Sequence, residues 1–274
     1  MKIAVTGGNG DMGSNLIPYL LEQGHTVVSL DRSIPANSTK GVNFMIADVR
    51  DFGQLVAGIR ECDALVHLAA IRSPGSHPDP VLYADNTISS YNALSAASTV
   101  GITHVCLASS INAIGGAFSR SPRYDYFPVD EKHPTYAEDP YSLSKWVLEQ
   151  QADAFARRFE WMTISSFRLH WLLNSREDAI QHSARLSDLA IRHLWAYTLL
   201  SEASRAILLS LTADFKGHEV FYIAAPQTAS KELSLELAHQ HYPDVQIRSD
   251  FSNRTGFFNC SKAEQILGWK HQEN

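Results

Sequence analysis

The sequence predicts an α/β fold, in which helices cover both faces of a doubly wound parallel sheet of about seven strands. Short apolar runs alternate with longer helical patterns, as in chains built from β-α-β units. The apolar runs are unbroken rather than alternating, which is typical of strands buried on both faces. A glycine turn joins the first apolar run to the first helical pattern at residues 7–13.

The expected elements follow one another in a regular order. The expected strands are residues 3–6, 26–30, 43–46, 65–68, 104–108, 162–167 and 219–223. The expected helices are residues 12–23, ended by Gly24, a helix that Asp51 would cap, residues 81–100 and residues 140–159. Beyond Arg168 the alternation weakens: residues 169–215 read as mostly helical, and residues 226–274 as a helix, a short strand and a tail.

The composition excludes several classes of protein. Of the 274 residues, 45% are hydrophobic and 19% charged, as in ordinary folded domains. The net charge of −6 and the pI of about 6.0 imply no strongly basic face, so we expect no nucleic-acid partner. The N-terminal apolar run is too short for a signal peptide, and no run approaches the roughly 18 residues of a membrane span. The three cysteines show no Cys-x-x-Cys spacing and suit a reducing compartment, so we expect a cytoplasmic protein.

The glycine turn has the pattern of a dinucleotide site. Residues 7–13 read Gly-Gly-Asn-Gly-Asp-Met-Gly, which contains G-x-x-G-x-x-G. Gly7 would allow the tight turn, Gly10 the approach of a pyrophosphate, and Gly13 the packing of the helix on the strand. The helix N-terminus at Asp11 and Met12 would offer unpaired N–H groups and a partial positive charge to the phosphates. The sequence therefore predicts a Rossmann-type site between the first strand and the first helix.

Asp31 ends the second strand about twenty residues beyond the loop, where a carboxylate can accept hydrogen bonds from the adenosine ribose. It would also repel the additional phosphate of NADP. Arg32 follows directly in the sequence and would weaken this preference for NAD over NADP. We therefore expect NAD as the cofactor, with NADP not excluded. Residues 1–168, with the strand near 219–223, are then the expected dinucleotide-binding domain, and residues 169–274 a small, interleaved substrate-binding region that does not fold independently.

Five motifs in order give the chain a resemblance to a known family. They are the glycine loop, Asp31, Asp48-Val49, His67-Leu68-Ala69-Ala70 and Tyr141-Ser142-Leu143-Ser144-Lys145. Over nearly its whole length the chain resembles the extended short-chain dehydrogenase/reductase family, in its NAD-dependent epimerase/dehydratase group. The resemblance implies that Asp48 and Val49 flank the adenine and that Leu68, Ala69 and Ala70 line the nicotinamide side of the pyrophosphate. It also implies a supporting role for Asn86 and a possible homodimer built on the long helices that carry Asn86 and Tyr141.

Tyr141 and Lys145 form the predicted catalytic pair. They are four residues apart on an expected helix that starts at Pro140, so their side chains share one face. The unperturbed pKa of tyrosine is about 10, and a nearby ammonium together with an oxidised nicotinamide would lower it by favouring the phenolate. The resemblance implies that Lys145 also holds the nicotinamide ribose. Exposed neighbours on a helix are the ordinary alternative for such a pair.

A serine at the end of the fifth strand is the predicted third catalytic group. Alignment on the family pattern through Gly115 places Ser110 there, where its hydroxyl would bind the substrate oxygen and orient Tyr141. Ser109 is the alternative. The two point to opposite faces of a strand, so only one can serve.

The substrate side departs from the family. After the sixth strand the chain reads Arg168-Leu169-His170-Trp171, without the Gly-Pro loop usual in nucleotide-sugar enzymes, and residues 194–202 lack the usual acidic pair. The chain also ends soon after residues 260–269, which look like the family's closing helix. These departures argue against a nucleotide-sugar substrate.

The shorter layout resembles the uronate dehydrogenases of the family, in which a serine, an asparagine and an arginine hold the substrate. Ser73, Asn112 and Arg192 fall at comparable places in this chain. An arginine suits a carboxylate because its fork binds two oxygens at once, whereas a solvated helix position is the alternative for Arg192. With Ser110 and His170, these residues make up the predicted substrate site.

Residues 117–139 form an insertion between Ser110 and Tyr141. Either it covers the active site, or it is a surface loop docked by its aromatic side chains. The twelve histidines show no metal-binding pattern, and no metal is expected.

These observations predict an NAD(P)-dependent oxidoreductase that transfers hydride between nicotinamide and a hydroxyl or carbonyl of a small sugar-like or sugar-acid substrate. A sugar or nucleotide-sugar epimerase or dehydratase with tightly bound NAD is one alternative. A non-catalytic dinucleotide sensor is another.

Overall fold

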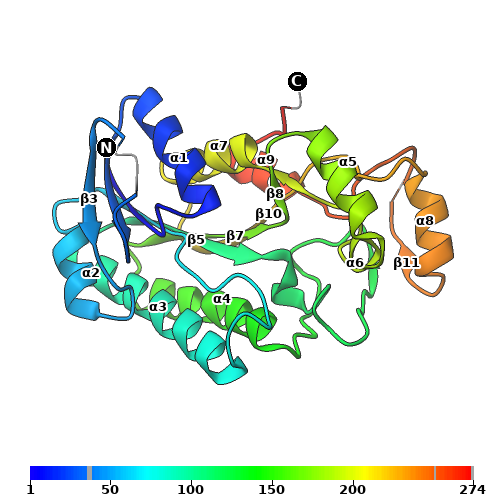
Figure 1. Cartoon of the computed structure of the whole chain (residues 1–274), viewed down its shortest axis with the longest axis horizontal. Helices are drawn as coiled ribbons and strands as arrows, with labels where there is room; N and C mark the ends of the chain where they lie inside the picture. The colour runs from blue at the N-terminus through cyan, green and yellow to red at the C-terminus, as the bar shows by residue number, and fades with distance from the viewer. Residues whose placement is uncertain (36–38, 250, 273–274) are drawn as a thin grey trace.

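A parallel sheet runs through the middle of the molecule (Figure 1). The computed structural model describes residues 1–35, 39–249 and 251–272, and within these ranges seven strands form the sheet in the order β10-β7-β5-β4-β1-β2-β3. The strands are β1 (Lys2–Thr6), β2 (Thr26–Asp31), β3 (Val42–Ile46), β4 (Ala64–His67), β5 (His104–Ser110), β7 (Thr163–Leu169) and β10 (Gly217–Ile223). The predicted doubly wound sheet of about seven strands is confirmed.

Helices cover both faces of this sheet (Figure 1). One face carries α1 (Asp11–Glu22), α7 (Leu200–Ser210) and α9 (Ser261–Leu267), and the other carries α2 (Phe52–Ile59), α3 (Asp79–Val100) and α4 (Pro140–Arg158). Helix α1 packs against α7, and α3 packs against α4 along their length. The layering is that of a three-layer α/β domain.

The remaining elements gather at the end of the molecule on the right of Figure 1. They are the 3-10 turn η1 (Ile111–Ile114), β6 (Tyr126–Phe127), β8 (Leu172–Leu173), α5 (Arg176–Arg185), α6 (Ser187–Arg192), β9 (Thr198–Leu199), α8 (Ser234–His241) and β11 (Gln246–Ile247). Strand β6 pairs with β11, and β8 with β9. Strand β10 lies beyond residue 169 in the chain yet pairs with β7, as expected for the strand near 219–223.

Local capping explains where the helices begin and end. Asp51 caps α2 as predicted, because its carboxylate accepts a hydrogen bond from the Gln54 N–H at 3.0 Å. Gly24 follows α1 with a φ of 79°, the left-handed conformation that glycine adopts without strain. Asp139 caps α4 by accepting from the N–H groups of Tyr141 and Ser142 at 3.0 and 2.9 Å. This last cap fixes the first turn of the helix that carries Tyr141.

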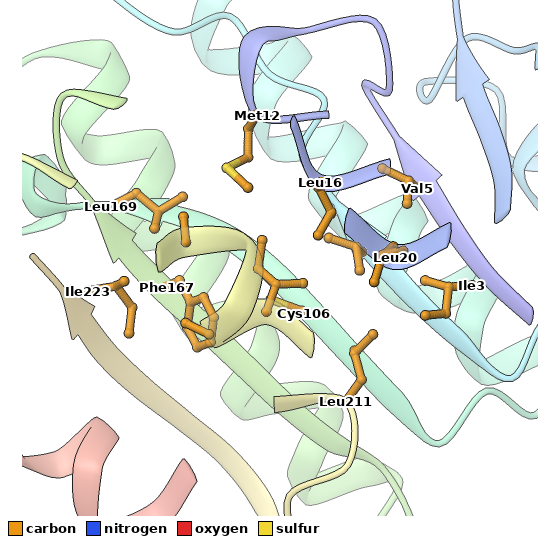
Figure 2. Packing of buried hydrophobic residues seen from close by; sticks show 14 of the residues in the cluster. Ile3, Val5, Met12, Leu16, Leu20, Cys106, Phe167, Leu169, Leu211 and Ile223 are labelled. Carbon is orange, nitrogen blue, oxygen red and sulfur yellow. The ribbon is translucent and has the colours of Figure 1, made fainter. Parts of the chain in front are cut away.

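A large apolar cluster holds α1 on the sheet. Figure 2 shows side chains of α1, β1, β5 and β7 converging in this cluster, among them Met12, Leu16, Leu20, Ile3, Val5, Cys106, Phe167 and Leu169. Full burial of one such side chain contributes roughly 1.5–3 kcal/mol. The glycine loop at the start of α1 is therefore anchored to the sheet on both of its sides.

Several strand ends differ from the sequence prediction by one or two residues. Strand β5 continues to Ser110 and β7 to Leu169, because the ladder extends through the pairs Ser109↔Arg168 and Ser110↔Leu169. Strand β4 ends at His67, so Leu68 starts the following loop. The polar residues Ser109 and Arg168 remain in the strands because buried partners satisfy them, as described below.

The insertion at residues 117–139 docks by its aromatic side chains. Tyr124 and Phe127 are buried with Phe251, Phe257 and other residues of the C-terminal part of the chain. The insertion is thus packed onto the molecule, and only its first residues approach the cleft described next.

Candidate active site

One cleft of about 670 Å³ follows the carboxyl ends of the sheet strands. It opens where the strand order reverses, since β1 has β2 on one side and β4 on the other. Every residue that we predicted for the site, except Arg192, lines this cleft: Gly7, Gly10, Asp11, Met12, Gly13, Asp31, Arg32, Asp48, Val49, Leu68, Ala69, Ala70, Ser73, Asn86, Ser110, Asn112, Tyr141, Lys145 and His170. Their individual roles stay predictions, but the structure brings them together.

The glycine loop makes a cradle that side chains would fill. Gly7 has a φ of 71°, and a Cβ there would lie 2.7 Å from the Ala69 nitrogen. A Cβ on Gly13 would lie 2.5 Å from the carbonyl oxygen of Gly8, so the helix can approach the loop only with glycine at this position. The first N–H groups of α1 face the cleft without intrahelical acceptors. This cradle fits a pyrophosphate group.

Asp31 lies at the rim of the cleft, and its carboxylate is held in place by the backbone. Its oxygens accept from the Asn9 N–H at 3.0 Å and from the Arg32 N–H at 2.7 Å. The carboxylate therefore links the end of β2 to the glycine loop. It is oriented before any ligand arrives.

Asp48 lies at the same end of the cleft, next to Val49, and is paired with Arg50. The Arg50 guanidinium lies 2.6 Å from the Asp48 carboxylate and 3.2 Å from that of Asp85. The hydrogen bond with Arg50 lowers the pKa of Asp48 to about 2. Asp48 is therefore ionised across the physiological range, and its side chain shapes this wall of the cleft.

Asn86 of α3 fixes the loop that follows β4. Its amide accepts from the Ile71 N–H at 2.8 Å and donates to the Ile71 carbonyl oxygen at 3.0 Å and to Ser144 Oγ at 3.1 Å. Asn86 thus joins this loop to α3 and α4. The contacts suit the supporting role expected for it.

Lys145 is buried at the centre of the cleft. Its side chain donates to the Ala108 carbonyl oxygen at 2.7 Å, and its Nζ lies 5.7 Å from the centroid of the Tyr141 ring. Burial lowers the pKa of Lys145 to about 8, and the charge of Glu149 partly offsets this effect. An ammonium has three N–H groups, so others remain for a ligand.

The electrostatics of Tyr141 differ from our expectation. Burial raises the pKa of the phenol, while a hydrogen bond with Ser110 and the charge of Arg72 act to lower it. We expected the ammonium of Lys145 to supply the lowering effect. In the protein alone, Tyr141 is therefore a protonated phenol at neutral pH.

Ser110 and Ser109 have different partners, as their strand positions require. Ser110 lines the cleft, where its hydroxyl accepts from the Asn112 N–H at 3.2 Å and acts to lower the pKa of Tyr141. Ser109 Oγ donates to Glu149 at 2.6 Å, on the face of β5 that also buries Leu107. Glu149 is in turn bound by two nitrogens of Arg168 at 2.9 and 2.8 Å. Ser110 is therefore the serine that contacts the tyrosine, and Ser109 belongs to a buried ion-pair network.

His170 and Trp171 line the far end of the cleft with Ser73 and Asn112. His170 Nδ1 accepts from the Trp171 N–H at 2.6 Å, and Nε2 donates to the His193 carbonyl oxygen at 3.0 Å. Burial lowers the pKa of His170 to about 3, so the ring is neutral. Both ring nitrogens are engaged within the protein, so His170 has none left for a substrate. This contrasts with the substrate contact predicted for it.

Arg192 is not among the described residues that line the cleft. Its guanidinium donates to the Ser119 carbonyl oxygen at 2.8 Å and ties α6 to the insertion. On this six-residue helix, the side chain of Arg192 lies on the side of the insertion. The next residue, His193, lines the cleft instead. The residue that the sequence analysis matched to the family's arginine, Arg192, therefore comes one position before the residue that lines the cleft.

Among the lining residues that the sequence did not predict, three carry the side-chain chemistry of the substrate end: Arg72, Phe118 and His193. Arg72 forms an ion pair with Asp11 of the glycine loop. The ring of Phe118, at the start of the insertion, makes edge contacts with the rings of Tyr141 and His193. None of the three belongs to a motif, and they converge only through the tertiary fold.

The described residues contain neither a cluster of metal-binding side chains nor a membrane-spanning helix. There is no group of three or more His, Cys, Asp or Glu side chains placed to hold a metal ion. The same part of the chain has no helix long and apolar enough to cross a membrane.

Comparison with known families gives a match over most of the chain. Residues 3–195 match the model of the NAD dependent epimerase/dehydratase family. A putative UDP-glucose 4-epimerase of Methanocaldococcus jannaschii is 32% identical over 163 residues, which are 57% of this chain and 52% of that protein. A putative dihydroflavonol 4-reductase of Synechocystis is 34% identical over 153 residues, 54% of this chain and 43% of that protein. The matched segment thus spans about half the length of these curated relatives.

Solved structures share the fold over the whole chain. The UDP-glucose 4-epimerase of Thermotoga maritima, solved with UDP-glucose, has a TM-score of 0.75 at 21% identity and covers 99% of this chain and 94% of its own. A mutated uronate dehydrogenase has a TM-score of 0.72 at 19% identity, with coverages of 100% and 82%. At these identities the likeness concerns the fold.

Proposed function

The chain belongs to the NAD dependent epimerase/dehydratase family, and we propose that it is an NAD(P)-dependent oxidoreductase of the extended short-chain dehydrogenase/reductase type. Its reaction would be hydride transfer between nicotinamide and a hydroxyl or carbonyl of a small sugar-like or sugar-acid substrate. One observation carries the proposal: a single cleft joins the glycine cradle and Asp31 to Ser110, Tyr141 and Lys145.

The cofactor end of the cleft fits NAD. Gly7, Gly10 and Gly13 leave room for the pyrophosphate at the N-terminus of α1. The oriented carboxylate of Asp31 would accept hydrogen bonds from the adenosine ribose and disfavour the phosphate of NADP. Lys145, already held by Ala108, would donate to the nicotinamide ribose.

The catalytic end offers a proton donor and acceptor beside the substrate oxygen. Ser110 would hydrogen-bond that oxygen, and Tyr141 would give its proton in reduction or take the hydroxyl proton in oxidation. Bound NAD would supply the hydride acceptor and a positively charged ring that favours the phenolate. Because Tyr141 is buried, water does not compete for this proton.

The substrate end favours a small polar molecule. Trp171 and Phe118 supply aromatic walls, and Ser73 and Asn112 lie among them. Polar groups between aromatic walls suit a molecule with hydroxyls on an apolar ring face. These residues support a sugar-like substrate, for which the relatives provide an independent precedent in the dTDP-6-deoxy-L-talose 4-dehydrogenase of Aggregatibacter actinomycetemcomitans, 27% identical over 160 residues.

An epimerase is the second candidate, because the chain is similar to a putative UDP-glucose 4-epimerase. Such an enzyme would use the same tyrosine, lysine and serine, but it would oxidise and re-reduce one carbon without releasing the cofactor. Net NADH formation separates the two functions.

The test is to purify the protein, identify any retained dinucleotide and screen sugar acids and nucleotide-sugars with added NAD or NADP. Stoichiometric NADH formation is expected. Turnover without added cofactor and without net reduction would replace this proposal by the epimerase. Dinucleotide binding with no turnover on the panel would favour the non-catalytic sensor.

We further propose a homodimer that pairs α3 and α4 of two copies, as the family resemblance implies. Ile88 and Tyr91 of α3 are exposed large apolar side chains that such a contact would cover. Light scattering should give twice the monomer mass, and Ile88→Glu should reduce it. The cytoplasmic location and the division at residue 168 into cofactor and substrate parts stay predictions.

A further inference from the structure

The imidazole of His193 presents a hydrogen-bonding atom that the protein leaves unsatisfied. His193 follows α6, lines the cleft and is only 3% exposed. Among the described residues, no hydrogen-bond partner reaches its Nε2 atom. A buried polar atom without a partner is costly, so such an atom at the wall of a cleft points to a ligand.

The contacts of the neighbouring His170 decide which atoms of His193 carry hydrogen. A backbone N–H donates to His170 Nδ1, and a backbone carbonyl accepts from His170 Nε2, so His170 is the Nε2–H tautomer. His193 Nδ1 lies 3.2 Å from this same Nε2–H. Two N–H groups cannot face each other there, so His193 Nδ1 is an acceptor without hydrogen. The hydrogen of the neutral His193 ring is therefore on Nε2.

Neighbouring rings hold this imidazole in place and relate it to Tyr141. Its ring packs 4.3 Å from the Trp171 indole, centroid to centroid, and meets His170 edge-on at 4.8 Å. Phe118 lies between the two functional rings, 5.6 Å from Tyr141 and 6.0 Å from His193. A substrate with its reacting oxygen at Tyr141 would therefore extend across Phe118 towards His193.

The backbone after His193 is also unusual. Leu194 and Trp195 both have positive φ angles, 54° and 48°, although neither is glycine. Bulky residues adopt this conformation only where the surrounding structure imposes it. Here the turn keeps the His193 carbonyl on His170 and the imidazole at the cleft.

We propose that His193 is a specificity-determining residue, whose neutral Nε2–H donates to an acceptor oxygen of the substrate remote from the reacting carbon. His170 is the positioning residue that sets the tautomer. This inference rests on the proposed oxidoreductase function and adds a selection rule to it. A hydroxyl, carbonyl or carboxylate oxygen is accepted at this place, whereas an ammonium group, which has no lone pair, is rejected.

The tautomer can be tested without a substrate. Long-range ¹H–¹⁵N spectra of ¹⁵N-histidine-labelled full-length protein, assigned with the variants His170→Gln and His193→Gln, should show both rings neutral with hydrogen on Nε2. Hydrogen on Nδ1 of His193 would overturn the proposal, whatever the enzyme's activity.

The substrate contact can be tested with three replacements at one position. Gln places a donor near the Nε2 position, Asn places one near Nδ1, and Phe keeps an aromatic ring without a donor. On whichever sugar acid the wild type oxidises, His193→Phe should raise KM about 10- to 100-fold, with a smaller change in kcat. His193→Gln should recover most of the loss and His193→Asn should not.

The controls separate this proposal from the function on which it rests. NAD affinity should be unchanged in all three variants. His182→Gln, which alters a histidine that also packs against Trp171 but does not line the cleft, should keep wild-type kinetics. In the wild type, an amino-sugar analogue should have a higher KM than the sugar acid. This difference should disappear in His193→Phe. Unchanged KM in His193→Phe, or recovery by Asn rather than Gln, would overturn the role of His193 alone. No NADH formation by the wild type on any compound would overturn the function, and the role of His193 with it.

Discussion

Ser109 and Ser110 are adjacent, yet their positions on β5 give them separate chemistry. Ser109 completes a buried ion pair, whereas Ser110 reaches Tyr141 at the cleft. The hydrogen bond from Ser110 counteracts the burial that raises the pKa of the phenol. In the proposed reaction, oxidation of a hydroxyl would need the phenolate, so Ser110 would set the pH at which the reaction proceeds.

Ser110→Ala should therefore move the ascending limb of the pH–rate profile for oxidation, along which the phenolate forms, to higher pH. Loss of a hydrogen bond of about 1.4 kcal/mol corresponds to about one pH unit. The measurement is kcat/KM against pH for NADH formation. Ser109→Ala is the matched control, and it should lower stability without moving the limb. An equal shift in both variants would contradict the assignment.

Asp31 should decide between the two dinucleotides. Asp31→Ser removes the carboxylate that would repel the NADP phosphate and leaves Arg32 beside that phosphate. The ratio of kcat/KM for NADP to that for NAD should rise about 10- to 100-fold, the range expected for one charged hydrogen bond. The double variant with Arg32→Ala should lose most of this gain. A ratio that stays at the wild-type value would show that Asp31 does not face the ribose.

At the scale of elements, the Glu149–Arg168 pair ties α4 to β7 beside the proposed catalytic residues. Both side chains are buried, Arg168 with 5% of its surface exposed. Removal of one partner leaves a buried charge, which costs more than the pair itself contributes.

Glu149→Ala should accordingly lower the free energy of unfolding by about 3–5 kcal/mol, measured by urea titration. Glu149→Leu combined with Arg168→Met should recover much of this loss, because neither charge then remains buried. The exposed pair Lys2–Glu61 is the control, and Lys2→Ala should cost less than about 1 kcal/mol. Similar losses in Glu149→Ala and Lys2→Ala would mean that burial does not govern this pair.

The sequence predicted the long elements and a short strand within residues 226–274, but it did not locate the other short strands, for a physical reason. Each sheet strand contains a short apolar run, and Asp51 and Gly24 mark helix ends through a local hydrogen bond or backbone conformation. Strands β6, β8, β9 and β11 have two residues each, too few to show any period. Their pairing depends on where distant segments meet.

The two ends of the cleft also differ in how well local sequence motifs predict them. Its cofactor end depends on the glycine loop and on single strand ends, so local motifs located Gly7, Asp31 and Tyr141. Its substrate end combines Arg72, Phe118 and His193 from three separate segments. The sequence pointed to Arg192 instead of the adjacent His193 because a helix of six residues is too short for its periodicity to show which side chains face the cleft.

At the scale of the whole molecule, four buried histidines make stability depend on pH: His133, whose pKa burial also lowers, and three others. Burial lowers the pKa of His67 and of His170 from 6.5 to about 3, and that of His193 well below 6.5. The unfolded chain takes up these protons below pH 6.5, whereas the native protein does not until the pH is much lower. Stability is therefore complete above pH 6.5 and is lost as the pH falls towards 3.

Each such histidine contributes a slope of about 1.4 kcal/mol per pH unit within this window. Urea titrations between pH 7 and 5 should show the free energy of unfolding falling with acidification. His67→Gln should reduce the slope by about one histidine's share, and replacement of the exposed His239 should leave it unchanged. Equal slopes in wild type and His67→Gln would show that His67 is not held neutral.

The central claim is that Tyr141 moves the proton in hydride chemistry at a bound NAD. The most direct measurement compares wild type and Tyr141→Phe for NAD affinity and for NADH formation on the same substrate. NAD affinity should be unchanged, and kcat should fall by about 10²- to 10⁴-fold, the contribution typical of a general acid or base. NADH formation by Tyr141→Phe at the wild-type rate would contradict it.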